Sequence, residues 1–350
     1  MILTIFLLKH IALNKAVPVE YVFALVMLLL SGITLFRLYR LRVKSRFQAF
    51  MFLGASIPAA FFLYAVAPWS YLSYYLKYVL AGLYIIGLLL VIPRIIRAQA
   101  FSETIKTPWL VGRILLMLIA ITLVLYWVAG YTYIASDAVN LKFPFHTDKK
   151  YYVMQGGASR LTNPAHRNFS KQLYGYAMDV AALYPLGNRA NGIHPKDLNN
   201  YAIYGDTLFS PCDGVVIQMV DSIVENTPGT YFIKLVHGNH VIIQNKDYRL
   251  FMAHFIRKSV TVKIGDTVSL GQPIARVGNA GFSAEPHLHI NVLKGYKKSN
   301  LLEKLSKLPI GKRFTDLPEW QFEYPYDGNS VPFLFDGEFY SINDIMQRKN

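Results

Sequence analysis

The sequence predicts a two-part protein, an N-terminal α-helical membrane domain of about four spans followed by a C-terminal all-β domain. Two observations lead to this fold class. The first part holds four apolar runs of the length that crosses a bilayer. After residue 150 the pattern changes to short β-branched and aromatic runs broken by Gly, Asp, Asn and Pro. We therefore expect a membrane domain at 1–130, a connector at 131–150 and a β domain at 151–350.

The four apolar runs predict membrane-spanning helices. A helix needs ~20 mostly apolar residues to cross the hydrocarbon layer. One such run could be a buried core helix, but four in succession favour a membrane domain. Lys77 and Arg113 lie near the ends of their runs, where long side chains can reach the membrane interface. The expected spans lie near 17–36, 50–67, 72–92 and 109–129.

The charge is distributed unevenly. The chain has 36 Lys and Arg against 21 Asp and Glu, a net charge of +15. Before residue 131 there are 12 Lys and Arg but only two acids, Glu20 and Glu103, so this part carries +10 of the total. A basic chain can indicate nucleic-acid binding. Here most of the excess lies between apolar runs, which favours membrane topology and predicts no nucleic-acid partner.

The basic connections predict the orientation. The segment after the first run, "RLYRLRVKSR", holds five basic residues and no acid, and the segment after the third is also basic. Basic connections stay on the cytoplasmic side. The β domain is then extracytoplasmic, periplasmic or facing the cell wall, in an integral protein of the inner or cytoplasmic membrane.

The β domain is predicted from four runs joined by short polar turns. Successive runs of this kind favour antiparallel strands. Short strands around two glycine turns are expected within 260–278. The single cysteine, Cys212, excludes an intramolecular disulfide and is expected to be buried. The four runs lie at 214–220, 230–236, 240–245 and 248–255.

The segment "GNAGFSAEPHLHI" contains His287 and His289. On a strand, residues two apart share a face, so these imidazoles lie side by side. His254 closes the run "YRLFMAHF", while His166 and Asp179 lie in "HRNFSKQLYGYAMDV". Each histidine could be structural, but imidazoles with a carboxylate form a ligand set that zinc accepts. The chain contains no HExxH motif, which excludes a helical zincin on that criterion.

These residues resemble the lysostaphin/LytM-type zinc metallopeptidases, which cut peptide bonds in bacterial peptidoglycan. The strand pattern G-x-S-x-x-x-H-x-H is matched by Gly281, Ser283, His287 and His289, and the A-H strand end by Ala253–His254. The resemblance covers roughly residues 166–292 and does not include the apolar runs. It implies an antiparallel β-sandwich or half-barrel of the duplicated hybrid-motif type.

The resemblance also implies a site. One Zn²⁺ would be held by His166, Asp179 and His289, with His254 and His287 as the catalytic pair. One of the pair would act as general base and the other would stabilise the oxyanion, and their order stays open. The common family spacing is H-x-x-x-D, whereas 12 residues separate His166 from Asp179. The stretch "YGYAMD" looks like a variant with a longer loop, and His146 is the alternative first ligand.

Other residues have plainer interpretations. Ser283 lacks the G-x-S-x-G elbow of a nucleophilic serine, so we interpret it as a turn residue. His237 is expected to be structural. His240 is expected to face solvent or a neighbouring strand.

These residues suggest three functions. The first is a membrane-anchored zinc endopeptidase that acts on peptidoglycan peptides and contacts membrane lipid and, through its spans, a regulatory membrane partner. The second is a non-catalytic LytM-like regulator that activates another cell-wall hydrolase. The third is a biotinyl or lipoyl carrier, for which Lys263 lacks the flanking methionines. All five positions of the site are filled, which favours the enzyme.

Overall fold

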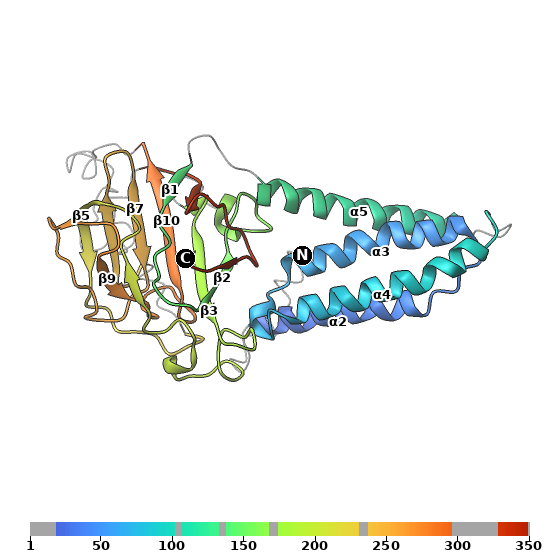
Figure 1. The fold of residues 1–350 in the computed structure, drawn as a ribbon, viewed down its shortest axis with the longest axis horizontal. Coiled ribbons are helices and arrows are strands. Elements are labelled where there is room, and N and C mark those ends of the chain that lie inside the picture. The colour runs from blue at the N-terminus through green and yellow to red at the C-terminus, as the bar shows by residue number, and fades with distance from the viewer. Residues whose placement is uncertain are drawn as a thin grey trace, which may run out of the picture. The chain divides into compact units, whose positions relative to one another are not determined.

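The computed structural model describes residues 19–101, 107–132, 138–167, 174–230, 237–295 and 328–348. The chain divides into two compact units. One contains the chain up to Gly130 together with Pro185–Asn188, and the other contains the remainder. Figure 1 shows long helices in the first and strands in the second.

The helical unit contains four α-helices within the described residues. Each is long and apolar enough to cross a membrane, judged by length and composition. Ser45 caps one of them by accepting a hydrogen bond from the backbone N–H of Gln48, which satisfies a donor that the first turn would leave unpaired. The helices are α2 (Val19–Tyr39), α3 (Arg46–Val66), α4 (Leu76–Arg97) and α5 (Thr107–Thr132). The four apolar helices expected from the sequence are therefore confirmed.

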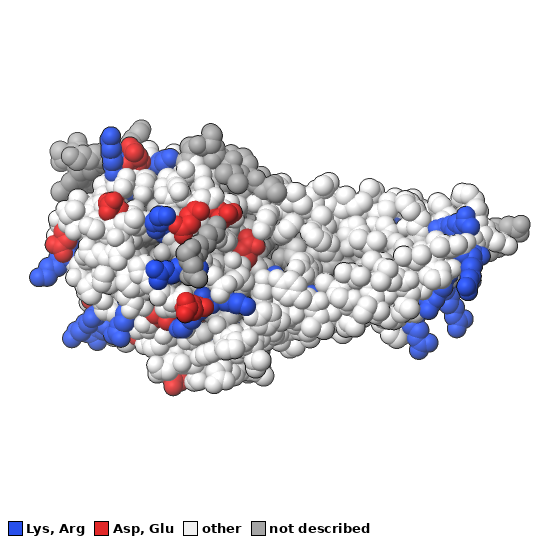
Figure 2. All heavy atoms as spheres, in the orientation of Figure 1, with Lys and Arg blue, Asp and Glu red and all other residues white. Residues whose placement is uncertain are grey.

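The surface of the helical unit is apolar along its length. Leu29, Leu89, Ile96 and Leu125 are each 59–65% exposed. Figure 2 shows that the long sides of these helices carry almost no charge on the face drawn, while Lys and Arg gather at one end. Such a surface suits a membrane anchor.

The β unit is built on one large antiparallel sheet. Its nine strands have the order β13-β2-β3-β10-β7-β6-β5-β8, with β11 also paired to β10. The strands in that order are β13 (Ile345–Met346), β2 (Lys150–Gln155), β3 (Met178–Leu183), β10 (Leu288–Lys294), β7 (Arg249–Ala253), β6 (His240–Gln244), β5 (Gly214–Val220) and β8 (Thr267–Val268), with β11 at Asn329–Ser330.

Two smaller pairs complete the described strands. The first, β4 (Thr207–Phe209) with β9 (Pro273–Arg276), is antiparallel. The second, β1 (Val139–Leu141) with β12 (Phe333–Phe335), is parallel. A parallel pair was not expected from the sequence. Its strands come from opposite ends of the domain, so no hairpin imposes an antiparallel direction on them.

The runs predicted at 214–220, 240–245 and 248–255 form β5, β6 and β7. The mostly antiparallel β domain is confirmed, as is the β6–β7 hairpin, in which Gln244 lies opposite Arg249. The expected strand at 230–236 lies almost wholly outside the described residues. The segment 131–150, expected as a connector, contributes β1 to the fold.

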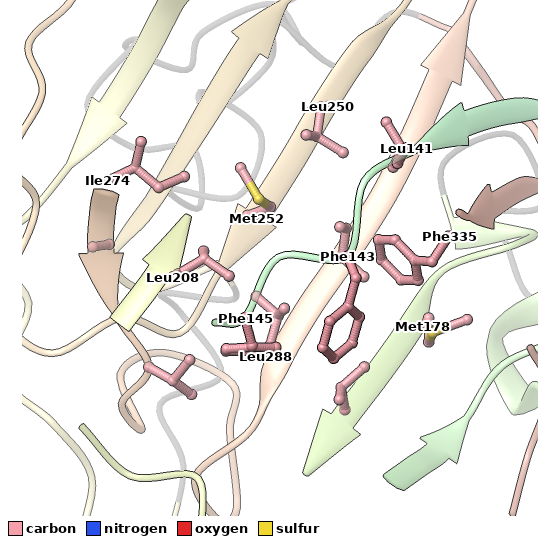
Figure 3. Packing of buried hydrophobic residues seen from close by; sticks show 14 of the residues in the cluster. Leu141, Phe143, Phe145, Met178, Leu208, Leu250, Met252, Ile274, Leu288 and Phe335 are labelled. Atoms are coloured by element: carbon pink, nitrogen blue, oxygen red, sulfur yellow. The ribbon is translucent and has the colours of Figure 1, made fainter. Parts of the chain in front are cut away.

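The core lies on one face of the large sheet. Leu288 and Ile290 of β10 pack there with Leu250 and Met252 of β7. Leu208 of β4 belongs to the same cluster, together with aromatic rings such as Phe145, which stacks on Tyr151 at 4.0 Å. Figure 3 shows Leu250, Met252 and Leu288 of the large sheet in this cluster together with Leu208 and Ile274 of the β4–β9 pair. Because side chains alternate along a strand, residues such as His289 lie on the opposite face.

Candidate active site

Strand register places a row of polar side chains on the face away from the core. His289 of β10 lies opposite Asp179 of β3 and Ala253 of β7. Asp179 in turn lies opposite Gln155 of β2, and Ala253 opposite His240 of β6. Directly opposed residues share a face of the sheet. We call Gln155, Asp179, His289, Ala253 and His240 the polar row.

Asp179 and His289 face each other at the centre of the polar row. Nδ1 of His289 lies 2.7 Å from Oδ1 of Asp179, and Nε2 of His287 lies 3.7 Å from the same oxygen. The amide of Gln155 donates a hydrogen bond to Oδ2. Burial raises the pKa of Asp179, but the neighbouring imidazoles, His287 foremost, outweigh burial and hold it at about 2. The carboxylate is therefore ionised and can bind a cation.

His254 reaches the site through an unusual backbone conformation. It follows Ala253, so regular alternation would turn its side chain to the core face. Its φ is instead +72°, in the left-handed region. Its ring lies 4.7 Å from that of His287 and 5.8 Å from that of His289, measured between centroids. Such a backbone costs of order 1–3 kcal/mol outside glycine and is concentrated at functional sites.

Hydrogen bonds fix which nitrogen of each catalytic-pair candidate can accept a proton. Nδ1 of His254 lies 2.7 Å from the carbonyl oxygen of Ala280, and Nδ1 of His287 lies 2.8 Å from that of Glu285. A carbonyl only accepts, so in the neutral rings Nδ1 carries the hydrogen and Nε2 the lone pair. Burial holds the pKa of His254 well below its usual value. His254 is therefore neutral near pH 7 and can accept a proton at Nε2.

The turn that carries His287 is fixed by buried polar contacts. Oγ of Ser283 donates to Oδ1 of Asn279 at 2.7 Å and lies 3.1 Å from Nδ1 of His287. Arg189 donates from Nε and Nη2 to the two carboxylate oxygens of Glu285, each at 2.5 Å, and both side chains are buried. Ser283 is thus a turn residue, as the sequence predicted.

His166 lies in the 3-10 turn Pro164–Arg167. Its Nδ1 is 2.5 Å from the carbonyl oxygen of Gly175, four residues before Asp179. Histidine ligands of metals commonly donate one ring N–H to a carbonyl in this way. The alternative ligand, His146, instead stacks on Phe209 of β4 at 3.9 Å.

The donor atoms at the site are of the types that zinc binds. Asp179 and His289 are an oxygen and a nitrogen donor in contact, and Nε2 of His289 is buried with no hydrogen-bond partner among the described residues. In the part of the chain that the structure describes, no group of three or more His, Cys, Asp or Glu side chains has the geometry of a metal site. The full three-ligand set, with His166 included, stays a prediction.

The two remaining histidines of the domain core are buried. Burial lowers the pKa of His237 to about 3 and that of His240 to about 4. Of the two alternatives expected for His240, exposure to solvent is wrong because the residue has no exposed surface, whereas contact with a neighbouring strand is found, its ring lying 5.6 Å from that of Phe251 in β7. Cys212 is buried as predicted, and burial raises its pKa to about 11.

Three residues of the site were not found from the sequence. Gln155 contacts Asp179 only because β2 pairs with β3. Arg189 and Glu285 are far apart in the chain, and neither lies in a pattern that predicts pairing. For Glu285 the sequence offered one signal, a charged residue within the motif "GFSAEPHLH" that carries the histidines of the site.

Residues 198–301 match the model of peptidase family M23. The resemblance to lysostaphin/LytM-type metallopeptidases is thereby confirmed for this part of the chain. The matched segment contains His254, His287 and His289, whereas His166 and Asp179 precede it.

Two curated relatives illustrate what the chain is similar to. The peptidoglycan DD-endopeptidase ShyA of Vibrio cholerae is 28% identical over 150 residues, covering 42% of this chain and 31% of the relative. An uncharacterized metalloprotease of Haemophilus influenzae is 29% identical over 149 residues, covering 40% and 29%. The chain thus spans about a third of the length of these relatives.

Two solved structures are similar in part. A zinc-containing peptidase from Vibrio cholerae shares 23% identity, with 45% of this chain and 37% of that chain covered and a TM-score of 0.26. The catalytic domain of lysostaphin from Staphylococcus simulans shares 24% identity, with 31% and 80% covered and a TM-score of 0.19. These TM-scores are too low to support an argument.

Proposed function

We propose that the protein is a membrane-anchored zinc metalloendopeptidase that hydrolyses peptide bonds in bacterial peptidoglycan. The observation that carries the proposal is the convergence of His287 and His254 on Asp179 and His289, the pair at the centre of the polar row. The M23 match and the name of the Vibrio cholerae relative support the reaction class and the substrate class.

We assign His166, Asp179 and His289 as the residues that would hold one Zn²⁺. When bound, zinc supplies a water of lowered pKa and polarises the scissile carbonyl. Gln155 orients the Asp179 carboxylate by donating to Oδ2, the oxygen that does not face His289.

We assign His254 and His287 as the residues that move protons. A neutral imidazole with its lone pair at Nε2 can accept a proton from the attacking water and return it to the leaving amine. The second imidazole can donate a hydrogen bond to the developing oxyanion once it is protonated. The carbonyls of Ala280 and Glu285 bind Nδ1 of the two rings, which leaves Nε2 of each ring as the nitrogen that accepts the proton or, once protonated, donates to the oxyanion.

We propose that the helices anchor the peptidase domain outside the cytoplasm. The basic ends of α2 and α4, near residues 37–46 and 94–97, would lie on the cytoplasmic side. The proposed division is a membrane domain at 1–130, a segment at 131–150 that connects the domains and contributes β1 to the second, and an extracytoplasmic peptidase domain at 151–350. The bilayer, the peptidoglycan peptide and a regulatory membrane protein are the proposed partners.

The test uses the full chain purified in detergent. Bound zinc is quantified, and purified peptidoglycan is assayed for newly released amines. We expect Asp179→Ala and His289→Ala to lose both zinc and hydrolysis. His254→Ala should keep zinc and lose hydrolysis by a factor of about 10²–10⁴, the contribution of a general acid–base group.

His146→Ala is the matched control for His166→Ala. If His166 is the first ligand, only the His166 variant loses zinc. Zinc bound without hydrolysis in the intact protein would point to a gated enzyme. No bound zinc would refute the metallopeptidase and leave the LytM-like regulator in its place.

A further inference from the structure

The helical unit contains a cavity of about 280 Å³ between α2, α3 and α4. An engineered apolar cavity of about 150 Å³ stays dry and binds benzene, so this cavity has room for a larger apolar group. Its lining includes Ser31 and Thr34 of α2 and Lys77, Ala81, Tyr84 and Leu88 of α4.

Most polar groups of the wall are engaged within the protein. Oγ of Ser31 donates to the carbonyl oxygen of Met27, and Oγ1 of Thr34 to that of Ser31, at 2.8 and 2.7 Å. The hydroxyl of Tyr84 is hydrogen-bonded to Ser56. These side chains therefore offer the cavity mainly their carbon atoms, which suits a hydrocarbon ligand.

One end of the cavity carries a cation. Lys77, near the start of α4, is only 5% exposed, whereas the sequence favoured an ammonium extended to the interface. Its Nζ lies 4.0, 5.1 and 5.3 Å from the ring centroids of Tyr74, Tyr78 and Tyr64. Among the described residues that line the cavity, Lys77 is the one charged side chain and none is acidic. A cation held within a membrane helix is a mark of a functional site.

The length of the cavity matches one leaflet of a bilayer. From Lys77 to Leu88, α4 rises about 16 Å at ~1.5 Å per residue. The hydrocarbon layer is ~30 Å thick, so a lipid chain in one leaflet reaches about half of that distance. The cation lies at the end of the cavity next to the helix terminus, where the headgroups are.

We infer that this cavity binds one chain of a lipid whose anionic headgroup lies at Lys77. The apolar wall accommodates the chain, the positive charge selects the headgroup, and the length fits a single leaflet. The inference rests on the proposed membrane insertion but not on the proposed peptidase chemistry. The site would therefore exist even in a protein without hydrolase activity.

The test is native mass spectrometry of the full chain in a non-ionic detergent, titrated with lipids of identical acyl chains. We expect phosphatidylglycerol to bind more tightly than phosphatidylcholine. Lys77→Met should reduce that preference about fivefold, from the ~1 kcal/mol that one lysine contributes to an anionic headgroup. Ala81→Phe should reduce binding of both lipids by filling the cavity.

Arg113→Met is the matched control, because Arg113 is also a cation in a membrane helix but does not line the cavity. It should leave the preference unchanged. Equal binding of the two lipids to the intact protein would overturn the inference, as would an unchanged preference in Lys77→Met. Binding that survives Ala81→Phe would place the lipid elsewhere and also overturn it. Inorganic phosphate should not displace the lipid.

Discussion

The ion pair between Arg189 and Glu285 offers a direct test of how the turn carrying His287 is held. Arg189→Met keeps most of the side-chain volume but leaves the Glu285 carboxylate buried without its bidentate partner. Glu285→Leu likewise leaves the guanidinium of Arg189 buried without its carboxylate partner. We expect each single variant to destabilise the β unit strongly.

The magnitude follows from the burial of both groups. The side chains of Arg189 and Glu285 are 2% and 8% exposed. Removing one partner of a buried pair costs about 3–5 kcal/mol, chiefly because the other charge stays desolvated. For a domain of this size each kcal/mol lowers the unfolding midpoint by about 2–4 °C, so a fall of about 6–20 °C is expected.

The double variant Arg189→Met/Glu285→Leu decides the reasoning. Replacing both partners by apolar side chains removes the stranded charge, so the double variant should be at least as stable as either single variant. Thermal unfolding of the full chain in detergent measures all four proteins. Costs that simply add in the double variant would refute the idea that the pair acts as a unit.

Further predictions concern the site and its surroundings. Ser283→Ala should cost about 1 kcal/mol of stability and lower hydrolysis while leaving bound zinc unchanged, because it removes hydrogen bonds to Asn279 and near His287; loss of zinc would contradict this. His254→Gly should be more stable than His254→Ala by about 1 kcal/mol and should therefore unfold at a higher temperature, because glycine adopts φ +72° without strain. Equal unfolding midpoints would argue against backbone strain. Gly238→Ala should be far more damaging than Gly265→Ala, although both have positive φ, because a Cβ at 238 would lie 2.2 Å from the carbonyl oxygen of Ala280 while none meets an atom within 4 Å at 265; chemical denaturation compares them. Stability should fall as pH drops from about 6.5 toward 4, because His237 and His240 have pKa values of about 3 and 4 when folded and near 6.5 when unfolded, so the unfolded chain binds more protons. Each contributes up to ~1.4 kcal/mol per pH unit, and His240→Gln should flatten the slope.

Much of the site could be predicted from local sequence patterns. Alternation predicts a shared face for His287 and His289, which are two residues apart. In the structure His289 lies on β10, His287 immediately precedes that strand, and both imidazoles face the carboxylate of Asp179. The strand-rich domain and the four apolar helices also follow from runs within the sequence. The alternation and length of apolar runs sufficed to predict features that depend on residues close together in the chain.

The remaining features depend on long-range register or on backbone conformation. Nothing near His240 in the sequence places it in the same row as Asp179, which requires the pairing of four strands. Alternation along the strand predicts that His254 faces the core. Its positive φ angle turns the side chain to the other face instead. Lys77 faces a cavity that exists only once three helices pack together.

The polar row also has a consequence for how β3 finds its place. Met178, Val180, Ala181, Ala182 and Leu183 are all buried, so both faces of this strand are apolar and hydrophobic patterning alone would tolerate a shifted alignment. Asp179 removes that ambiguity. A slip of one residue against β10 would turn its carboxylate toward the core that contains Leu288 and Ile290, where a charge costs several kcal/mol. The carboxylate proposed to bind metal thus also selects the single strand alignment in which a metal could be bound.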